Sequence, residues 1–330
     1  MSAILVTGGA GFIGSHLVDS LISMGKKVTV LDDLSGGFRG NVNPKATFIK
    51  GSILNNKLVT AIFEKRRISF VFHLAAYAAE GLSHFIKRYN YKNNLIGSVN
   101  LINASIKYNI QCFVFTSSIA IYGRNLCPMS EDMTPLPIDS YGIAKFAVEQ
   151  ELNISHDLFG LNYIIFRPHN VFGERQNIGD KYRNVIGIFM NQIMCGKSLT
   201  IFGDGTQTRA FTYIKDVAPV IARSIYVSKA YNQIFNVGAD EPISVNKLAE
   251  EVSKAMGVSS NLRYVKERDE VKDAYCSHKK INETLKFKPK YSLPEGLRIM
   301  AEWAKKYGSR KSKSFKNIEI RKNLPNVWLE

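Results

Sequence analysis

The chain has 330 residues with a mass of 37.0 kDa, of which 45% are hydrophobic and 22% charged, and its formal net charge is +16. This composition predicts a globular chain with a sizeable core and excludes a disordered or collagen-like protein. No apolar run approaches the ~20 residues of a membrane-spanning helix. The short apolar stretch Ala3–Val6 runs directly into Thr7-Gly8-Gly9, so no secretory signal is expected. We therefore expect a cytoplasmic protein without membrane attachment.

The positive charge does not have the distribution of a nucleic-acid-binding protein. Eight basic and two acidic residues lie between positions 305 and 330, and the remaining excess is spread along the chain. No basic helix with interleaved aromatic residues is present in the sequence, so nucleic acid is not an expected partner. The charge favours small anionic ligands that carry phosphate. The four cysteines are scattered and the six histidines do not cluster with them, so neither a disulfide framework nor a metal site is expected.

The first 170 residues alternate short apolar runs with amphipathic stretches. The pattern predicts strands at Ile4–Val6, Val28–Leu31, Thr47–Ile49, Phe70–Phe72, Phe113–Phe115 and Tyr163–Phe166. Most of these runs are apolar throughout, as expected of strands that helices cover on both faces. Strands alternating with helices predict an α/β fold with a doubly wound parallel sheet.

After Arg167-Pro168 the pattern loosens into shorter elements separated by polar and glycine-rich turns. Helices are predicted around Ser244–Met256 and Pro294–Tyr307. We predict two domains: residues 1–170, with a return segment at about 211–240, bind a cofactor, and residues 171–330 form a smaller mixed α/β substrate domain. A basic tail occupies about 308–330. Few of its residues before Leu324 are apolar, so that part is expected to be mobile.

A glycine-rich turn follows the first strand and opens the first helix. Gly8, Gly11 and Gly14 have the spacing at which glycines allow a tight turn, close approach of a pyrophosphate and close packing of helix on strand. Phosphates there would meet free N–H groups and the positive end of the helix dipole. Asp32 lies eighteen residues after Gly14, at the end of the second strand. Because an acid at that place accepts hydrogen bonds from a ribose diol and repels a 2′-phosphate, the predicted cofactor is NAD.

Tyr141 and Lys145 lie one helical turn apart, and Ser118 lies just past the end of an apolar strand. A phenol has a pKa of ~10 and is a poor base at neutral pH. Positive charge from Lys145 and from an oxidised nicotinamide would favour the phenolate. Tyr141 would then take a proton from a substrate hydroxyl while the cofactor takes hydride from the same carbon, and Ser118 would hydrogen-bond to the reacting oxygen.

With these motifs the sequence resembles an extended short-chain dehydrogenase/reductase of the nucleotide-sugar epimerase and dehydratase branch. The resemblance covers nearly the whole chain. It is carried by Thr7–Gly14, Asp32, His73–Ala76, Asn94–Gly97, Ser117-Ser118 with Tyr122-Gly123, Tyr141 with Lys145, Arg167–Gly173 and Gly203–Tyr213. It implies a Rossmann-type sheet, an NAD cofactor and a nucleotide-diphospho-sugar substrate.

The resemblance also implies roles for individual residues. Those expected to contact the cofactor are Gly8, Gly11, Phe12, Ile13, Gly14, Asp32, Ser52, Ile53, Leu74, Ala75, Ala76, Asn94, Tyr141, Lys145 and Pro168. Those expected to contact the substrate are Ser118, Tyr141, Asn170, Arg209, Arg268 and Tyr275, with the two arginines on the diphosphate. Catalysis is expected from Ser118, Tyr141 and Lys145. The helices near Asn94–Tyr108 and Tyr141–Leu158 would pair in a homodimer.

The residues beside Ser118 discriminate between reactions. Dehydratases of the family resemble one another in carrying Asp-Glu directly after the hydroxyl residue, where this chain has Ile119 and Ala120. A site with only Ser118, Tyr141 and Lys145 suits reversible oxidation at one carbon, so we expect a 4-epimerase of the UDP-glucose/UDP-galactose type. A large residue at the Tyr275 position resembles enzymes restricted to sugars without an N-acetyl group.

Several positions depart from the family pattern. Ser52 replaces a common aspartate near adenine, Ala210 follows Arg209 where an aspartate is usual, and Lys215 stands where an acid is common. The loop containing Glu80 and His84 is also unlike the commonest epimerase loop. Glu80 or His84 would supply the extra acid or base of a dehydratase, 5-epimerase or reductase, which is the alternative activity. A third alternative is a cofactor-sensing binding protein, which would not need the Tyr141, Lys145 and Ser118 set.

Overall fold

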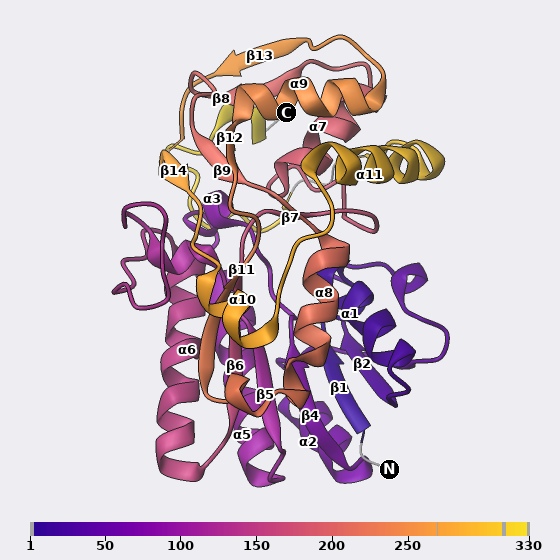
Figure 1. Ribbon diagram of the computed structural model, residues 1–330, viewed down its shortest axis with the longest axis vertical. Coiled ribbons are helices and arrows are strands. Elements are labelled where there is room, and N and C mark those ends of the chain that lie inside the picture. Colours follow the sequence, from indigo (N-terminus) through magenta and orange to yellow (C-terminus); the bar gives the residue numbers. More distant parts are fainter. Residues whose placement is uncertain (1–2, 269, 312–314, 329–330) are drawn as a thin grey trace.

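A computed structural model describes residues 3–268, 270–311 and 315–328 of the chain. Its larger part is a seven-stranded parallel sheet with the strand order β11-β6-β5-β4-β1-β2-β3 (Figure 1). The strands are β1 (Ala3–Thr7), β2 (Val28–Asp32), β3 (Thr47–Lys50), β4 (Ile68–His73), β5 (Cys112–Thr116), β6 (Tyr163–Pro168) and β11 (Gln233–Val237). All neighbouring strands are parallel, which confirms the predicted doubly wound sheet.

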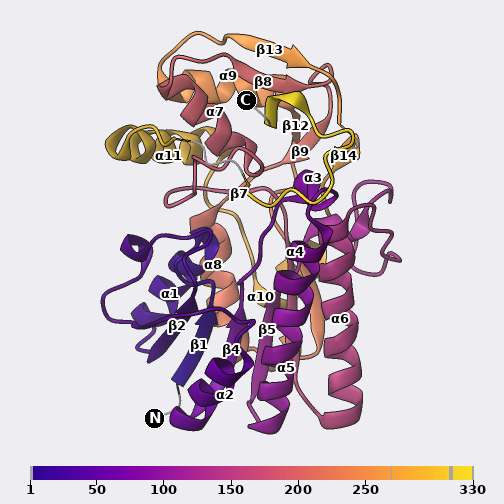
Figure 2. The ribbon, with the colours of Figure 1, turned by 180° about the vertical axis from the view of Figure 1, so that it is seen from behind.

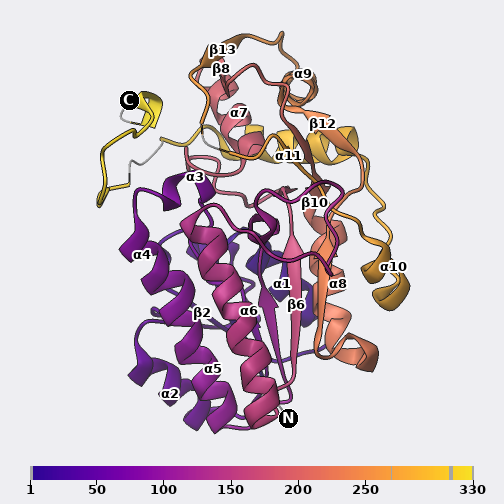
Figure 3. The same ribbon diagram turned by 90° about the vertical axis from the view of Figure 1, so that its left-hand side faces the viewer.

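Helices cover both faces of this sheet (Figure 3). They are α1 (Phe12–Ser23) and α8 (Ile214–Arg223) on one face, and α2 (Asn56–Lys65), α5 (Gly97–Lys107) and α6 (Ser140–Phe159) on the other. Within β1, Ile4 and Val6 pack toward α1 and α8, whereas Leu5 packs toward α2, α5 and α6. Successive side chains of a strand point to opposite faces, so a strand that is buried on both sides has no polar positions. This explains the uniformly apolar runs in the sequence.

The helix that carries the tyrosine–lysine pair has defined ends. Asp139 caps α6, its carboxylate accepting a hydrogen bond of 2.8 Å from the amide of Gly142. Gly160 ends the helix with φ of 70°, a conformation that glycine adopts without steric cost. The cap therefore fixes where the first turn of α6, with Tyr141, begins beside the end of β5.

The smaller group of elements lies beyond the carboxyl ends of the sheet strands (Figure 2). Its helices include α7 (Val185–Met194), α9 (Val245–Met256) and α11 (Leu293–Tyr307). The short helices α3 (Glu80–Ser83) and α4 (Lys87–Tyr91) follow β4, with α4 in line with α5 beside α6, and α10 (Lys279–Leu285) packs beside β11. The strands of the smaller group form three small sheets: β8 (Leu199–Phe202) with β13 (Leu262–Val265), β7 (Val171–Phe172) with β10 (Thr212–Tyr213), and β9 (Thr208–Ala210) between β12 (Pro242–Ser244) and β14 (Asp273–Ala274). The two helices predicted in this region are confirmed as α9 and α11. The predicted return segment enters the main sheet as β11.

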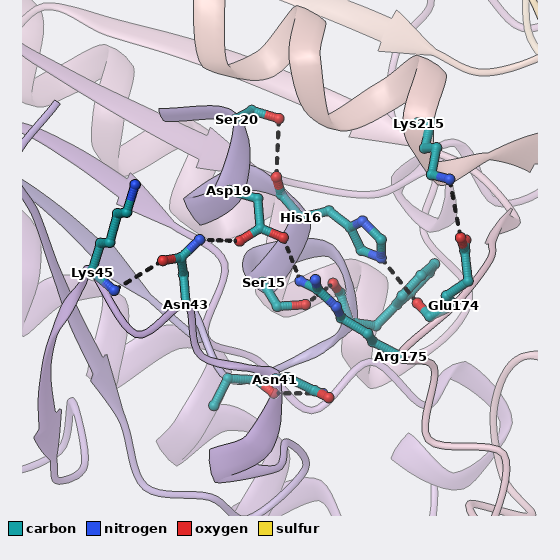
Figure 4. A network of polar contacts seen from close by, with 12 residues as sticks. Ser15, His16, Asp19, Ser20, Asn41, Asn43, Lys45, Glu174, Arg175 and Lys215 are labelled. Atoms are coloured by element: carbon teal, nitrogen blue, oxygen red, sulfur yellow. Dashed lines mark hydrogen bonds and ion pairs between the residues drawn. The ribbon is translucent and has the colours of Figure 1, made fainter. Parts of the chain in front are cut away.

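A polar network fastens the loop after β7 to the outer face of α1 (Figure 4). Arg175 forms an ion pair of 2.7 Å with Asp19, and the His16 ring lies 3.0 Å from the carbonyl of Glu174. Lys215 forms an ion pair of 3.2 Å with the Glu174 carboxylate. This contact gives the Lys215 ammonium an acidic partner within the fold. The network joins the first helix of the sheet to the segment leading toward α7.

The C-terminal segment packs onto the rest of the molecule. Residues 315–328 lie against α3 and α4 (Figure 3). Phe315 and Ile318, from the stretch that the sequence predicts to be mobile, contact this cluster, and Leu324 and Trp328 after it are buried. Residues 312–314, which belong to the same predicted tail, lie outside the described residues. No local sequence pattern reveals this packing, because the aromatic residues that receive the segment are far away in the chain. Within the described ranges, no helix is long and apolar enough to cross a membrane.

Candidate active site

The turn between β1 and α1 is shaped by its glycines. Gly8 has φ of +74°, and a Cβ there would lie 2.7 Å from the backbone nitrogen of Ala75. A Cβ on Gly14 would lie 2.2 Å from the carbonyl oxygen of Gly8. Both contacts are shorter than a carbon atom tolerates, so these positions require glycine. No side chain among the described residues caps α1 at Gly11, which leaves the helix N-terminus available to an anion.

Asp32 stands at the end of β2, and it lines the same cavity as the glycine turn. Its carboxylate accepts hydrogen bonds from the amides of Ala10 at 2.9 Å and Leu34 at 2.8 Å. Burial raises the pKa of this carboxyl, and the two amide hydrogen bonds oppose the shift. The acid is therefore held rigidly beside the glycine turn, the arrangement that suits the ribose diol of a dinucleotide. The glycine turn and Asp32 together fit NAD.

One cavity of about 470 Å³ joins this turn to the smaller group of elements. Nearly all of the residues predicted to contact cofactor or substrate line it: Gly8, Gly11, Phe12, Ile13, Gly14, Asp32, Ser52, Ile53, Leu74, Ala75, Ala76, Ser118, Tyr141, Lys145, Pro168, Asn170, Arg209 and Arg268. The carboxyl ends of the parallel strands thus open onto a single crevice, as is usual for this architecture. Glu80 and His84 line the same cavity.

Tyr141, Lys145 and Ser118 meet where β5 ends. The Ser118 hydroxyl accepts a hydrogen bond of 3.1 Å from the amide of Ala120, and its side chain opposes the rise in the pKa of Tyr141. The Lys145 ammonium donates a hydrogen bond of 2.7 Å to the carbonyl of Thr116. The ammonium nitrogen lies 5.7 Å from the centre of the Tyr141 ring. Burial lowers the pKa of Lys145 to about 7. Burial raises the pKa of Tyr141, so its ionisation depends on the charges placed near it.

The side chains next to Ser118 are apolar and buried. Ile119 is 8% exposed and Ala120 is 9% exposed, and neither carries a titratable group. Two other hydroxyls at this strand end, those of Thr116 and Ser117, are buried without a hydrogen-bond partner among the described residues. Neither apolar neighbour of Ser118 can therefore exchange a proton.

Glu80 is an acidic residue of the cavity with a strongly shifted pKa. Its side chain is exposed to solvent within the cavity, and the surrounding protein walls together with the charge of Asp139 raise its pKa to about 7. The charges of Arg209 and Arg268 oppose that rise. The hydroxyl of Ser83, in the same short helix α3, accepts a hydrogen bond of 3.2 Å from the amide of Tyr141. The loop that carries Glu80 is thereby tied to the start of α6.

The two predicted phosphate-binding arginines line the same cavity. Arg209 donates hydrogen bonds of 2.8 Å to the carbonyls of Thr208, Val271 and Lys272, so its guanidinium is fixed in place. Arg268 forms an ion pair of 3.1 Å with Glu270, and its guanidinium lies 4.1 Å from the centre of the Phe202 ring. Fixed guanidinium groups of this kind suit the oxygens of a diphosphate.

Two predicted site residues do not line the cavity. The Asn94 side chain is buried and bonds to the backbone of Tyr77, accepting from its N–H at 2.9 Å and donating to its carbonyl at 3.1 Å. Asn94 thus holds in place a cavity-lining residue. Tyr275 also does not line the cavity, although Val271 and Ala274 from the same stretch of chain do. Its role in limiting the sugar substituent stays a prediction.

Arg183 is a cavity-lining residue that sequence reasoning missed. Its guanidinium bonds to Asp180 at 2.7 Å and lies 4.8 Å from the centre of the Tyr77 ring. It also reaches the glycine loop after β2, because a Cβ on Gly36 would lie 3.2 Å from Nη2. Its positive charge opposes the rise in the pKa of Tyr141. A lone arginine before a helix carries no distinctive sequence signal, so only the fold reveals this position.

The chain is similar to known proteins that act on nucleotide sugars. The chain is 37% identical over 305 residues to a putative UDP-glucose 4-epimerase of Methanocaldococcus jannaschii, covering 92% of this chain and 98% of that protein. Among solved structures, UDP-glucose 4-epimerase of Thermotoga maritima with UDP-glucose matches with a TM-score of 0.87 and 38% identity, over 92% of this chain and 99% of that one. The Thermus thermophilus UDP-glucose 4-epimerase complex with NAD matches with a TM-score of 0.86 and 30% identity, over 91% and 98% of the two chains. Residues 4–238 match the model of the NAD dependent epimerase/dehydratase family, and the chain belongs to that family.

Proposed function

We propose that this protein inverts the configuration at C4 of a UDP-hexose, with UDP-glucose and UDP-galactose as the substrate pair. The observation that carries the proposal is the meeting of Tyr141, Lys145 and Ser118 beside the two apolar residues Ile119 and Ala120. This set of residues supports oxidation and reduction at one carbon and offers no acid–base pair for removing water at the neighbouring carbons. The named relatives support the choice of a UDP-sugar.

In the first half-reaction Tyr141 accepts the proton of the 4-hydroxyl, and Ser118 hydrogen-bonds to the same oxygen. The glycine turn and Asp32 would hold NAD, which would supply reversible hydride transfer at C4. Arg183 opposes the rise in the pKa of Tyr141. Lys145, whose nitrogen lies 5.7 Å from the centre of the phenol ring, adds positive charge below its own pKa of about 7 and so favours the ionised phenol. Arg209 and Arg268 hold the diphosphate while the 4-keto sugar turns to present its other face. Tyr141 then returns the proton to the oxygen of the inverted alcohol.

The reaction is tested by incubating the purified protein with UDP-glucose and following the anomeric protons by NMR. UDP-galactose is the expected product. Reactions started from UDP-glucose and from UDP-galactose should reach the same equilibrium ratio of the two. A product lighter by one water would contradict the proposal and favour a dehydratase. UDP-N-acetylglucosamine serves as the second substrate, because the proposed role of Tyr275 predicts that its turnover is much slower.

A second candidate rests on Glu80. A carboxyl with a pKa of about 7 inside the sugar cavity is suited to proton transfer at a carbon acidified by the 4-keto group. Such transfer at C5 would give a 5-epimerase or the first step of a dehydratase. The reaction in deuterated water separates the two candidates, since C4 inversion leaves C5 unlabelled and proton transfer at C5 introduces deuterium there.

We also propose that the protein works as a cytoplasmic homodimer in galactose metabolism, with residues 1–170 and the return segment holding NAD and the rest of 171–330 holding the sugar nucleotide. An exposed apolar stripe on α6 supports the dimer: Ile143, Ile154 and Leu158 are 43%, 50% and 69% exposed at helical spacing. Light scattering of the purified protein should give twice 37.0 kDa. The variant Leu158→Arg should shift that mass toward the monomer, and a monomeric wild type would contradict the dimer.

A further inference from the structure

The C-terminal segment 315–328, here termed the strap, packs against side chains that line the active-site cavity, among them Tyr77 and Tyr182. It is outside the residues 4–238 that match the family, and Figure 3 shows it beside α3. The side chains that receive it come from both parts of the molecule, and they include Tyr77, Phe85 and Tyr89 after β4 and Tyr182 before α7. The strap therefore connects the loop that carries Glu80 with the substrate side of the cavity.

The first half of the strap is anchored by specific contacts. The Phe315 amide donates a hydrogen bond of 3.0 Å to the Tyr182 hydroxyl, and the Phe315 ring lies 4.9 Å from that of Tyr89. The Glu319 carboxylate accepts two hydrogen bonds of 2.9 Å, from the amides of Arg88 and Tyr89 in the first turn of α4. An acid at that place satisfies free N–H groups and is favoured by the helix dipole.

The second half of the strap ends in Trp328, which is 4% exposed. Its ring lies 5.3 Å from that of Tyr182 and 6.4 Å from that of Phe202. The Arg268 guanidinium lies 5.9 Å from the centre of the Trp328 ring and 4.1 Å from the centre of the Phe202 ring. A cation over an aromatic face is attracted to it and loses few of its N–H donors, because these point along the plane of the guanidinium.

Trp328 also lies close to Gly81, in the loop that carries Glu80. A Cβ on Gly81 would lie 3.3 Å from the Trp328 ring and 3.6 Å from Nη1 of Arg268. Gly81, Arg268 and Tyr182 all line the cavity, so the indole lies directly behind three of its wall residues. Without the indole, Arg268 would keep its ion pair with Glu270 and the contact with Phe202, but one side of its guanidinium would be open.

We propose that Trp328 is a positioning residue for the nucleotide-sugar site: it holds the Arg268 guanidinium against Phe202 so that its N–H groups face the diphosphate. The inference rests on the proposed function, since a diphosphate is the group that Arg268 is expected to bind. In this proposal the strap contributes to substrate binding through Arg268 and does not contact the reacting carbon.

Binding of UDP to the full chain, measured by calorimetry, tests the inference through a double-mutant cycle. Arg268→Ala should weaken UDP binding by ~10- to 100-fold, the loss of a charged hydrogen-bonded contact. Trp328→Ala should weaken it by ~5-fold or more, and Trp328→Phe should recover most of that loss because it keeps an aromatic face. In the Arg268→Ala background, Trp328→Ala should cause no further loss. Losses that multiply in the double variant, or unchanged binding in Trp328→Ala, would overturn the inference.

Trp303→Ala is the matched control, because it removes the other tryptophan of the chain from α11, where it contacts Tyr307 and does not line the cavity. It should bind UDP as the wild type does. In turnover assays Trp328→Ala should raise KM for the UDP-sugar and change kcat little, whereas general unfolding would lower both the active fraction and the NAD content. This split separates positioning from a merely structural role.

A ligand-free measurement keeps the inference separate from the substrate assignment. The Nε–Hε signal of Arg268, identified by its loss in Arg268→Lys, should be shifted by the ring current of Trp328 in the NMR spectrum. Trp328→Ala should move it toward the position of a solvent-exposed arginine. A wild type that fails to bind UDP would contradict the proposed function, and an Arg268 signal unchanged by Trp328→Ala would contradict the positioning role.

Discussion

The Lys145 ammonium lies 5.7 Å from the centre of the Tyr141 ring and is held there by a hydrogen bond of 2.7 Å to the Thr116 carbonyl. Helix α6 fixes the spacing between the two residues, and the end of β5 fixes the position of the ammonium. A buried phenol resists ionisation, and a neighbouring cation is the ordinary means of offsetting that resistance. The relationship therefore connects the cap of α6 to the proton chemistry of the site.

Removing this charge should shift the pH dependence of activity. Lys145→Met should lower kcat by ~10²- to 10³-fold at neutral pH, the size of a general-base contribution. Because Lys145 carries its charge below its pKa of about 7, the loss relative to the wild type should be largest below that pH, and the remaining activity should increase toward alkaline pH. Lys107→Met, on the exposed face of α5, serves as the control and should leave the profile unchanged. A Lys145→Met profile parallel to that of the wild type would contradict the electrostatic role.

The charge of Glu80 should act on the same phenol in the opposite direction. Its negative charge contributes to raising the pKa of Tyr141, so Glu80→Gln should lower that pKa. The acid limb of the kcat/KM profile should then move to lower pH, with kcat at the optimum within about threefold of the wild type. If Glu80 is instead an obligatory acid or base, Glu80→Gln will lose most of its turnover at every pH.

Buried neutral histidines should make the fold sensitive to acid. Burial lowers the pKa of His169 to about 3 and holds that of His73 well below its ordinary value of 6.5. In the unfolded chain both rings take up a proton below about pH 6.5, so the unfolded state then binds more protons than the native state. Stability is therefore full above this pH and is lost as the pH falls toward 3.

Urea unfolding at several pH values measures this effect. Each buried histidine should contribute a slope of up to about 1.4 kcal/mol per pH unit below pH 6.5. His169→Asn should reduce the slope by about one such contribution, whatever its effect on the absolute free energy of unfolding. An identical slope in wild type and variant would show that His169 is not the titrating group.

The contact of Glu319 with α4 should have a local effect on stability. Glu319→Ala should cost about 1 kcal/mol, as expected for the loss of a capping carboxylate. Amide hydrogen exchange should become faster in residues 85–91 and stay unchanged in the central sheet. Glu302→Ala removes an exposed carboxylate that pairs with Arg298, and it provides the comparison. Equal exchange in the two variants would mean that the strap does not hold α4.

The sequence was sufficient for those parts of the fold that depend on local pattern. The strands of the main sheet, the glycine turn and the tyrosine–lysine spacing each depend on a short stretch of sequence, and their positions are confirmed. The return of β11 to the sheet was also predictable, because Ile234–Val237 contains apolar residues suited to a buried strand. The catalytic and binding roles of the individual residues stay predictions.

Other features depend on contacts between distant segments and could not be predicted. Asn94 belongs to a recognisable motif, yet its side chain supports the backbone of Tyr77 from behind the cavity wall. The packing of Trp328 needs Phe85, Tyr182 and Phe202, which no sequence pattern brings together. The low apolar content before Leu324 suggested mobility, but a few aromatic contacts and one carboxylate hold the described part of that segment.

The most direct test of the account is turnover of UDP-glucose by Tyr141→Phe, with bound NAD measured in the same preparation. The account predicts normal NAD content and a fall in kcat of at least ~10²-fold, since the phenol oxygen is the group that exchanges the proton. Wild-type turnover in a Tyr141→Phe protein with full NAD content would contradict it.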